Sequence, residues 1–69
     1  MKHKYRISKI ENDIITLDNR QRFKVDAFDS TKLTFWSPSF DSVEVEGSGA
    51  FVKITNLKRN ETVKAEELH

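Results

Sequence analysis

The chain contains no cysteine, only two glycines and one proline, and just two histidines, which stand at positions 3 and 69. Without cysteine there is no disulfide, no thiolate nucleophile and no cysteine metal site, so the fold has to depend on packing and hydrogen bonds. No apolar run of the length of a signal-peptide core or a membrane span follows the basic N-terminus. The sequence identifies no compartment: as written it fits a cytoplasmic protein, and it fits equally the mature domain of an exported one.

The same absences argue against catalysis. Chain ends usually fray, so His3 and His69 are poor candidates for a catalytic triad or a histidine metal site. Glu44 and Glu46 alternate with valines, which predicts a solvated outer strand face rather than a pair of catalytic carboxylates. Gly47-Ser48-Gly49 lacks the lysine and the following helix of a phosphate-binding loop. We therefore predict no enzymatic activity, no catalytic residue, no metal and no cofactor.

Short apolar stretches rich in β-branched and aromatic residues recur about every ten positions, separated by Asn, Asp, Ser or Gly. This spacing predicts an all-β domain covering residues 1–69, with ends at 1–3 and 66–69 that fray. The fold class that we expect is a small antiparallel barrel of six or seven strands, SH3-like or OB-like, and a small β-sandwich is the alternative. The expected strands cover residues 4–10, 14–17, 22–26, 32–36, 43–46, 50–55 and 62–65.

Period-two alternation also predicts the core. One face of each strand carries apolar side chains, and the other carries charged or polar ones. The residues expected to be buried are Ile15, Leu17, Phe23, Val25, Val43, Val45, Val52 and Ile54. Ile10 falls on the opposite face from Tyr5 and Ile7 unless a β-bulge intervenes. In the turn at residues 18–21, Asn19 is the residue expected to adopt a positive φ.

The net charge of +1 hides an uneven distribution. Residues 1–24 carry seven Lys or Arg against three acids, and residues 25–69 carry five against eight. Two readings stay open. The basic third forms a positive patch that attracts anionic partners, or the two parts pair across strands and only solubilise the surface.

The order of residues from 15 to 65 resembles a pattern of small bacterial single-domain β-proteins that have no assigned function. In that pattern an Ile-x-Leu strand meets an Asp-x-Gly turn, and a Trp-x-Pro-Gly-Asp-x-Val corner follows later. The matching stretches here are Ile15-Thr16-Leu17-Asp18-Asn19-Arg20, Phe23-Lys24-Val25, Trp36-Ser37-Pro38-Ser39-Phe40-Asp41-Ser42-Val43 and Ile54-Thr55-Asn56. Arg20 replaces the first glycine, and Ser39-Phe40 replaces the second. The resemblance implies an all-β fold and brings no function with it.

Two binding functions compete. The first is an interaction module for a protein or peptide, including a second copy of the chain, which pairs an acidic strand at 42–46 with a basic N-terminal strand by edge addition. Phe28 and Phe40 lie in predicted connections and are either exposed anchors for such a partner or lids over the barrel ends.

The alternative is single-stranded nucleic-acid binding, in which bases stack on exposed aromatic rings beside basic side chains. The sequence pI of about 8.1 is lower than expected for a dedicated nucleic-acid domain. No membrane association is expected. The residues of the combined candidate binding face are Arg6, Arg20, Arg22, Lys24, Trp36, Phe40 and Phe51.

Overall fold

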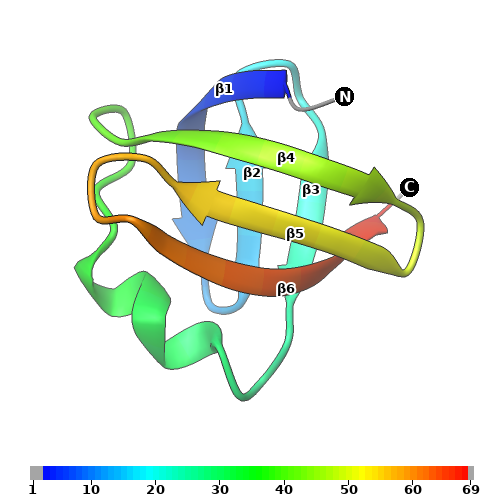
Figure 1. Ribbon diagram of the computed structural model, residues 1–69. Helices are drawn as coiled ribbons and strands as arrows, with labels where there is room; N and C mark the ends of the chain where they lie inside the picture. The colour runs from blue at the N-terminus through cyan, green and yellow to red at the C-terminus, as the bar shows by residue number, and fades with distance from the viewer. Residues whose placement is uncertain (1–2, 69) are drawn as a thin grey trace.

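The computed structural model describes residues 3–68 and is a closed barrel of six antiparallel strands (Figure 1). A 3-10 helix, η1, is the one helical element of the described residues. In chain order the elements are β1 (His3–Glu11), β2 (Ile14–Leu17), β3 (Arg22–Val25), η1 (Ser30–Phe35), β4 (Ser42–Ser48), β5 (Phe51–Asn56) and β6 (Glu61–Leu68). The prediction of an all-β barrel is confirmed, with six strands rather than seven.

The barrel is built from two three-stranded meanders joined by η1. β1, β2 and β3 pair in sequence order, as do β4, β5 and β6. The barrel closes through antiparallel pairing of β1 with β4 and of β3 with β6. Each strand therefore has a hydrogen-bonded neighbour on both sides along part of its length, and the sheet closes on itself as it would not in a sandwich.

The strand predicted at residues 32–36 is wrong, because this segment forms η1. Leu33 and Trp36 are buried, whereas Phe35 is 65% exposed. A 3-10 helix has three residues per turn, so residues at i and i+3 share a face. The spacing of Leu33 and Trp36 follows that period, and the apparent alternation of Leu33 with Phe35 did not reflect the buried face.

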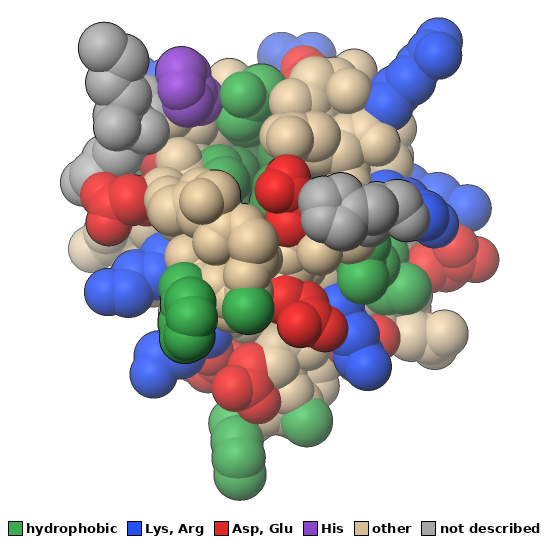
Figure 2. All heavy atoms as spheres, turned by 90° about the vertical axis from the view of Figure 1, so that its right-hand side faces the viewer, with side chains coloured by type: hydrophobic (Ala, Val, Ile, Leu, Met, Phe, Trp, Pro, Cys, Tyr) green, Lys and Arg blue, Asp and Glu red, His purple; other side chains and the backbone are tan. Residues whose placement is uncertain are grey.

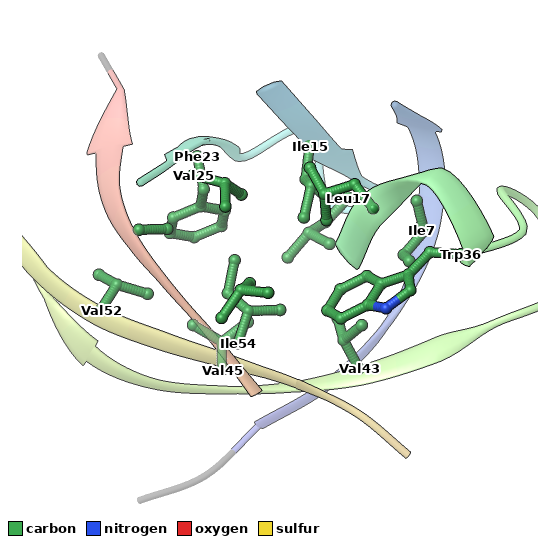
Figure 3. Close-up of a cluster of buried hydrophobic side chains, with 13 residues drawn as sticks. Ile7, Ile15, Leu17, Phe23, Val25, Trp36, Val43, Val45, Val52 and Ile54 are labelled. Carbon is green, nitrogen blue, oxygen red and sulfur yellow. The ribbon is translucent and has the colours of Figure 1, made fainter. Parts of the chain in front are cut away.

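The barrel interior holds one continuous hydrophobic core (Figure 3). All eight residues predicted to be buried are at most 8% exposed, which confirms the assignment of strand faces. The core also includes Ile7, Leu33, Trp36, Val63 and Ala65. Trp36 is 4% exposed, and its ring lies close to Val43 and Ile7 in Figure 3. The prediction that Trp36 belongs to the binding face is therefore wrong, because its indole is a core side chain and offers no surface for stacking.

Positive φ falls on different residues from the one predicted. In the β2–β3 turn it is Arg20 that has a φ of 72°, not Asn19. The Arg20 amide donates to the Leu17 carbonyl at 3.0 Å, and the Leu17 amide donates to the Gln21 carbonyl at 2.9 Å. This is the pattern of a three-residue hairpin loop, which places its left-handed residue third. Ser39 has a φ of 71°, so both positions where the resembling pattern has glycine adopt glycine-like backbone.

The β1–β2 register shifts between Ile7 and Lys9, which is the bulge that the Ile10 prediction allowed for. Ile10 is consequently half-buried and packs against the core. His3 and residues 66–68, predicted as frayed, lie in β1 and β6, because β6 continues to Leu68 along β3. Residues 1, 2 and 69 lie outside the described residues. No helix within residues 3–68 has the length and apolar character needed to cross a membrane.

Candidate functional site

A buried polar cluster links the η1–β4 loop to the β5–β6 turn. Both connections lie on the left in Figure 1. Asp41 is 1% exposed, and its Oδ2 accepts hydrogen bonds from the Ser37 amide at 3.1 Å and from Asn56 Nδ2 at 2.8 Å. Asn56 Oδ1 in turn accepts from the amides of Lys58 and Arg59. The η1–β4 loop and the β5–β6 turn are therefore held together through two buried side chains.

The Asn56 hydrogen bond is the main reason why the pKa of Asp41 is lowered, with smaller contributions from the Ser37 amide and from the positive charges of Lys58 and Arg59, while burial opposes them. Asp41 Oδ1 is buried without a hydrogen-bond partner. The charge on Asp41 is thus stabilised through one oxygen only. This cluster is buried, so its direct effect is to position loops rather than to contact a ligand.

Four of the five phenylalanines lie on the surface, and only Phe23 is buried. The exposed fractions are 92% for Phe28, 65% for Phe35, 80% for Phe40 and 88% for Phe51. Phe28 and Phe40 do not fold back over the barrel ends, so the lid interpretation is wrong. The guanidinium of Arg59 lies 6.0 Å from the Phe35 ring centre, within the range of a cation–π contact.

A groove of about 720 Å³ lies where β6 runs between the end of β3 and the start of β5. We call it the β6 groove. Its apolar lining residues are Val25, Ala27, Ala50, Phe51, Val52 and Ala65, and its charged lining residues are Lys24, Lys53, Lys64, Asp13, Asp26 and Glu66. The volume is in the range of small-ligand and peptide pockets.

Strand pairing explains how residues far apart in sequence meet in this groove. Lys24 lies opposite Glu66 across β3 and β6, and Lys53 lies opposite Lys64 across β5 and β6. Phe51 begins β5 with its side chain outward, because Val52 beside it points into the core. Phe51 is thus an exposed aromatic side chain at an apolar groove whose rim carries charges of both signs.

The predicted binding-face residues do not form one face. Arg6, Arg20 and Arg22 are exposed on the first meander, where the aromatic side chains Tyr5 and Phe23 are half-buried or buried in the barrel. Of the predicted set, only Lys24 and Phe51 line the β6 groove. Phe40 lies in the η1–β4 loop, outside it. Lys64 and Ala65 were not predicted as binding residues, because only the β3–β6–β5 pairing places them beside Phe51.

Charges of opposite sign also meet within the chain. β4, which contains the acidic residues predicted for edge addition, pairs with β1, so that Lys4 lies opposite Glu44. The pairing between an acidic and a basic strand that was predicted between two chains is therefore made within one chain, and residues 43–45 of β4 are paired on both sides. Figure 2, which shows the side that faces right in Figure 1, has acidic and basic side chains interspersed with hydrophobic ones.

A smaller hollow has a volume of about 190 Å³. It is lined by His3, Tyr5, Gln21, Phe23, Val45, Gly47, Ser48 and Glu67. The rings of His3 and Tyr5 lie 6.3 Å apart beside it. Within residues 3–68 no three His, Asp or Glu side chains converge in a way that would hold a metal ion. The β6 groove is the stronger candidate site, since it combines volume, apolar lining and an exposed aromatic ring.

Comparison with known proteins adds no relative: no protein-family model, no curated protein and no solved structure matches the chain.

Proposed function

We propose that this protein is a non-enzymatic interaction module that binds a segment of a protein or peptide in the β6 groove. The observation that carries the proposal is Phe51, which is 88% exposed at an apolar groove of about 720 Å³. Covering a phenylalanine side chain is worth roughly 1.5–3 kcal/mol, which is the size of an interface hot spot. An aromatic anchor beside a groove is the arrangement through which many interfaces gain most of their affinity.

The charge of the groove favours a protein segment over a nucleic acid. Three lysines and three acids line it, so its formal charge is balanced. A single strand of nucleic acid carries a negative charge on every nucleotide and is attracted by a groove of one positive sign. The basic side chains of the first meander lack exposed aromatic partners, because Trp36 is buried and Tyr5 is half-buried. Nucleic-acid binding is therefore the alternative against which the experiment is designed.

The test selects binders from a phage-displayed library of random peptides on the immobilised wild-type protein. Phe51→Ala is the test variant, and Phe40→Ala is the matched control, since it removes an equally exposed ring outside the groove. We expect peptides that bind the wild type and the control at least about tenfold more tightly than Phe51→Ala, given the size of the aromatic contribution. Selected peptides should shift the amide resonances of residues 24–27, 50–53 and 64–66.

Two results would contradict the proposal. One is a library in which no peptide depends on Phe51. The other is tight binding, at low salt, of a mixed-sequence single-stranded oligonucleotide with shifts at Arg20 and Arg22, which would favour the alternative. Sedimentation over a hundredfold range of concentration tests separately for association between copies of the chain, because a constant monomer mass argues against it.

A further inference from the structure

Two of the four exposed phenylalanines border the β6 groove. Phe51 lines the groove at the start of β5 and is 88% exposed. Phe28 is 92% exposed and directly follows Asp26 and Ala27, which line the groove beyond the end of β3. The Phe28 amide donates to Asp26 Oδ1 at 3.1 Å, so the backbone that carries this ring is held at the rim. The two rings therefore project from the two sides of the groove, with β6 between them.

The backbone that carries Phe51 is also held in place. Gly47 has a φ of 94°, and a Cβ atom at this position would collide with the Phe51 carbonyl, so glycine allows the two strands to approach here. The Glu67 amide donates to the Gly49 carbonyl at 2.7 Å, which ties the β4–β5 turn to β6. A ring on a backbone that is already ordered loses little further freedom when a partner covers it.

The charges of the groove are of the kind that can face a copy of the same surface. Its lining contains three lysines and three acids. A surface of one sign repels its own copy, whereas a surface with equal numbers of both signs can place opposite charges against each other. The commonest symmetric dimer has one twofold axis and uses the same patch on both subunits. The balanced lining of the β6 groove meets this requirement.

From these features we infer that the partner at the β6 groove is a second copy of the chain. Two copies associate around a twofold axis, and Phe51 of each copy packs into the groove of the other, with Phe28 at the rim of the contact. This inference rests on the function proposed above and names the partner of that site. Each copy supplies both a ring and a groove, so one interface contains two equivalent ring-in-groove contacts.

The available apolar area predicts a weak dimer. A phenylalanine buries roughly 150–250 Å², so Phe28 and Phe51 from two copies together bury roughly 600–1,000 Å². Stable, specific interfaces bury about 1,200–2,000 Å² in total, so the groove walls have to supply the remainder. We expect a dissociation constant between about 1 µM and 1 mM, with dimers at high concentration and monomers after dilution.

The test measures the mass by sedimentation equilibrium from about 10 µM to about 1 mM, a range chosen to include the expected dissociation constant. The wild-type mass should rise from monomer toward dimer. Phe51→Ala should weaken association at least about tenfold, given the size of the aromatic contribution. Phe40→Ala is the matched control and should associate like the wild type, because it removes an exposed ring outside the groove.

A mixture of isotope-labelled and unlabelled protein locates the interface. Filtered NMR spectra of this mixture should show contacts between the Phe51 ring of one copy and the methyl groups of Ala27 and Ala65 of the other, since both alanines line the groove. Peptides selected on the groove should dissociate the dimer, because they compete for the same surface.

Three outcomes would overturn this inference. A constant monomer mass over the whole range excludes the dimer, and if Phe51-dependent peptides are still selected, the partner is a different protein and the proposed function stands. A dimer that persists in Phe51→Ala and lacks the intermolecular contacts at the alanines uses another surface. A monomer whose groove resonances shift with a single-stranded oligonucleotide, and not with any peptide, contradicts both the inference and the proposed function.

Discussion

Replacing Asp41 by asparagine tests whether the buried polar cluster holds the barrel end together. The substitution keeps the size of the side chain and removes its charge. Asp41 Oδ2 accepts from the Ser37 amide and from Asn56 Nδ2 at the hydrogen-bond distances given above. A hydrogen bond to a charged group contributes about 1.5–3 kcal/mol and a neutral one about 0.5–1.5 kcal/mol, so each bond should weaken by about 1 kcal/mol.

The expected loss is about 2 kcal/mol in the free energy of unfolding, summed over these two bonds. Arg59 Nε lies 3.9 Å from Asp41 Oδ2, and its side chain is 42% exposed, so solvent screening leaves this ion pair a minor contribution. A single-domain protein of this size has roughly 3–5 kcal/mol of stability, so the loss would be a large part of the total. Asp18→Asn is the matched control, because Asp18 is exposed in the β2–β3 turn.

Urea denaturation followed by Trp36 fluorescence measures this loss. Trp36 is the only tryptophan, it is buried, and its Nε1 donates to Glu61 Oε1 at 3.0 Å, so unfolding changes its surroundings completely. At pH 7 the urea midpoint of Asp41→Asn should fall well below that of the wild type. The free energy of unfolding of Asp18→Asn should stay within about 0.5 kcal/mol of the wild-type value.

The pH dependence provides the decisive comparison. Because the hydrogen bond from Asn56 lowers the pKa of Asp41 in the folded protein, the charged form stabilises the fold. This contribution is complete above the unfolded aspartate pKa of about 3.9 and is lost as the pH falls through the lower folded pKa. The wild-type and Asp41→Asn curves should therefore converge in acid. A gap of the same size at pH 7 and at pH 2.5, or no gap at either, would refute the reasoning.

Three further predictions concern stability. Arg20→Gly and Ser39→Gly should each raise the free energy of unfolding by about 0.5–1 kcal/mol, because glycine removes the steric cost of a left-handed backbone; a lower melting temperature for both would contradict the assigned turns. Phe23→Ala should cost about 3–5 kcal/mol and unfold much of the population, whereas Phe40→Ala should change stability by less than about 0.5 kcal/mol, as judged by circular dichroism melting. Asp29→Asn should destabilise the protein above about pH 4 and have no effect in strong acid, because the pKa of Asp29 is lowered, chiefly by the hydrogen bond from the Lys64 amide; equal urea midpoints at pH 7 would contradict this.

Period-two alternation predicted the strands well because each strand of a closed barrel has one face in the core. The β2 boundaries at Ile14 and Leu17 agree with the sequence interpretation, and Val52 and Ile54 point inward while Phe51 and Lys53 point outward, as predicted. The alternation failed only where the buried face repeats every third residue, in η1. A short apolar stretch fits either a strand or a single turn of helix, so the local sequence pattern alone could not distinguish the two.

The turn at Arg20 shows a different limit. Asparagine tolerates positive φ better than arginine does, so intrinsic preference pointed to Asn19. The pairing of β2 with β3 instead fixed the loop length, and loop length determined which residue became left-handed. Arg20 stands where the resembling pattern has glycine, which agrees with its left-handed backbone. Tertiary pairing thus overrode residue preference.

The β6 groove could not be predicted from the sequence, because it depends on which strands become neighbours. Phe51 was singled out by its type and Lys24 by its charge, but Lys64 and Ala65 enter the groove only through the pairing of β6 with both β3 and β5. Sequence analysis identifies outward side chains strand by strand. It does not say which outward side chains share a surface, since that information lies in the closure of the barrel.

Closure also explains why the exposed phenylalanines bear on function rather than on folding. The interior of a small barrel is filled by the inward side chains of its own strands, and here Phe23 and Trp36 already occupy it with aliphatic residues around them. A further ring could enter only by overpacking the core, which is destabilising. Each strand already has a hydrogen-bonded neighbour on both sides, which favours recruitment of a partner through outward side chains. An outward ring such as Phe51 contributes free energy when another molecule covers it, so the surface that carries it is where binding has to be measured first.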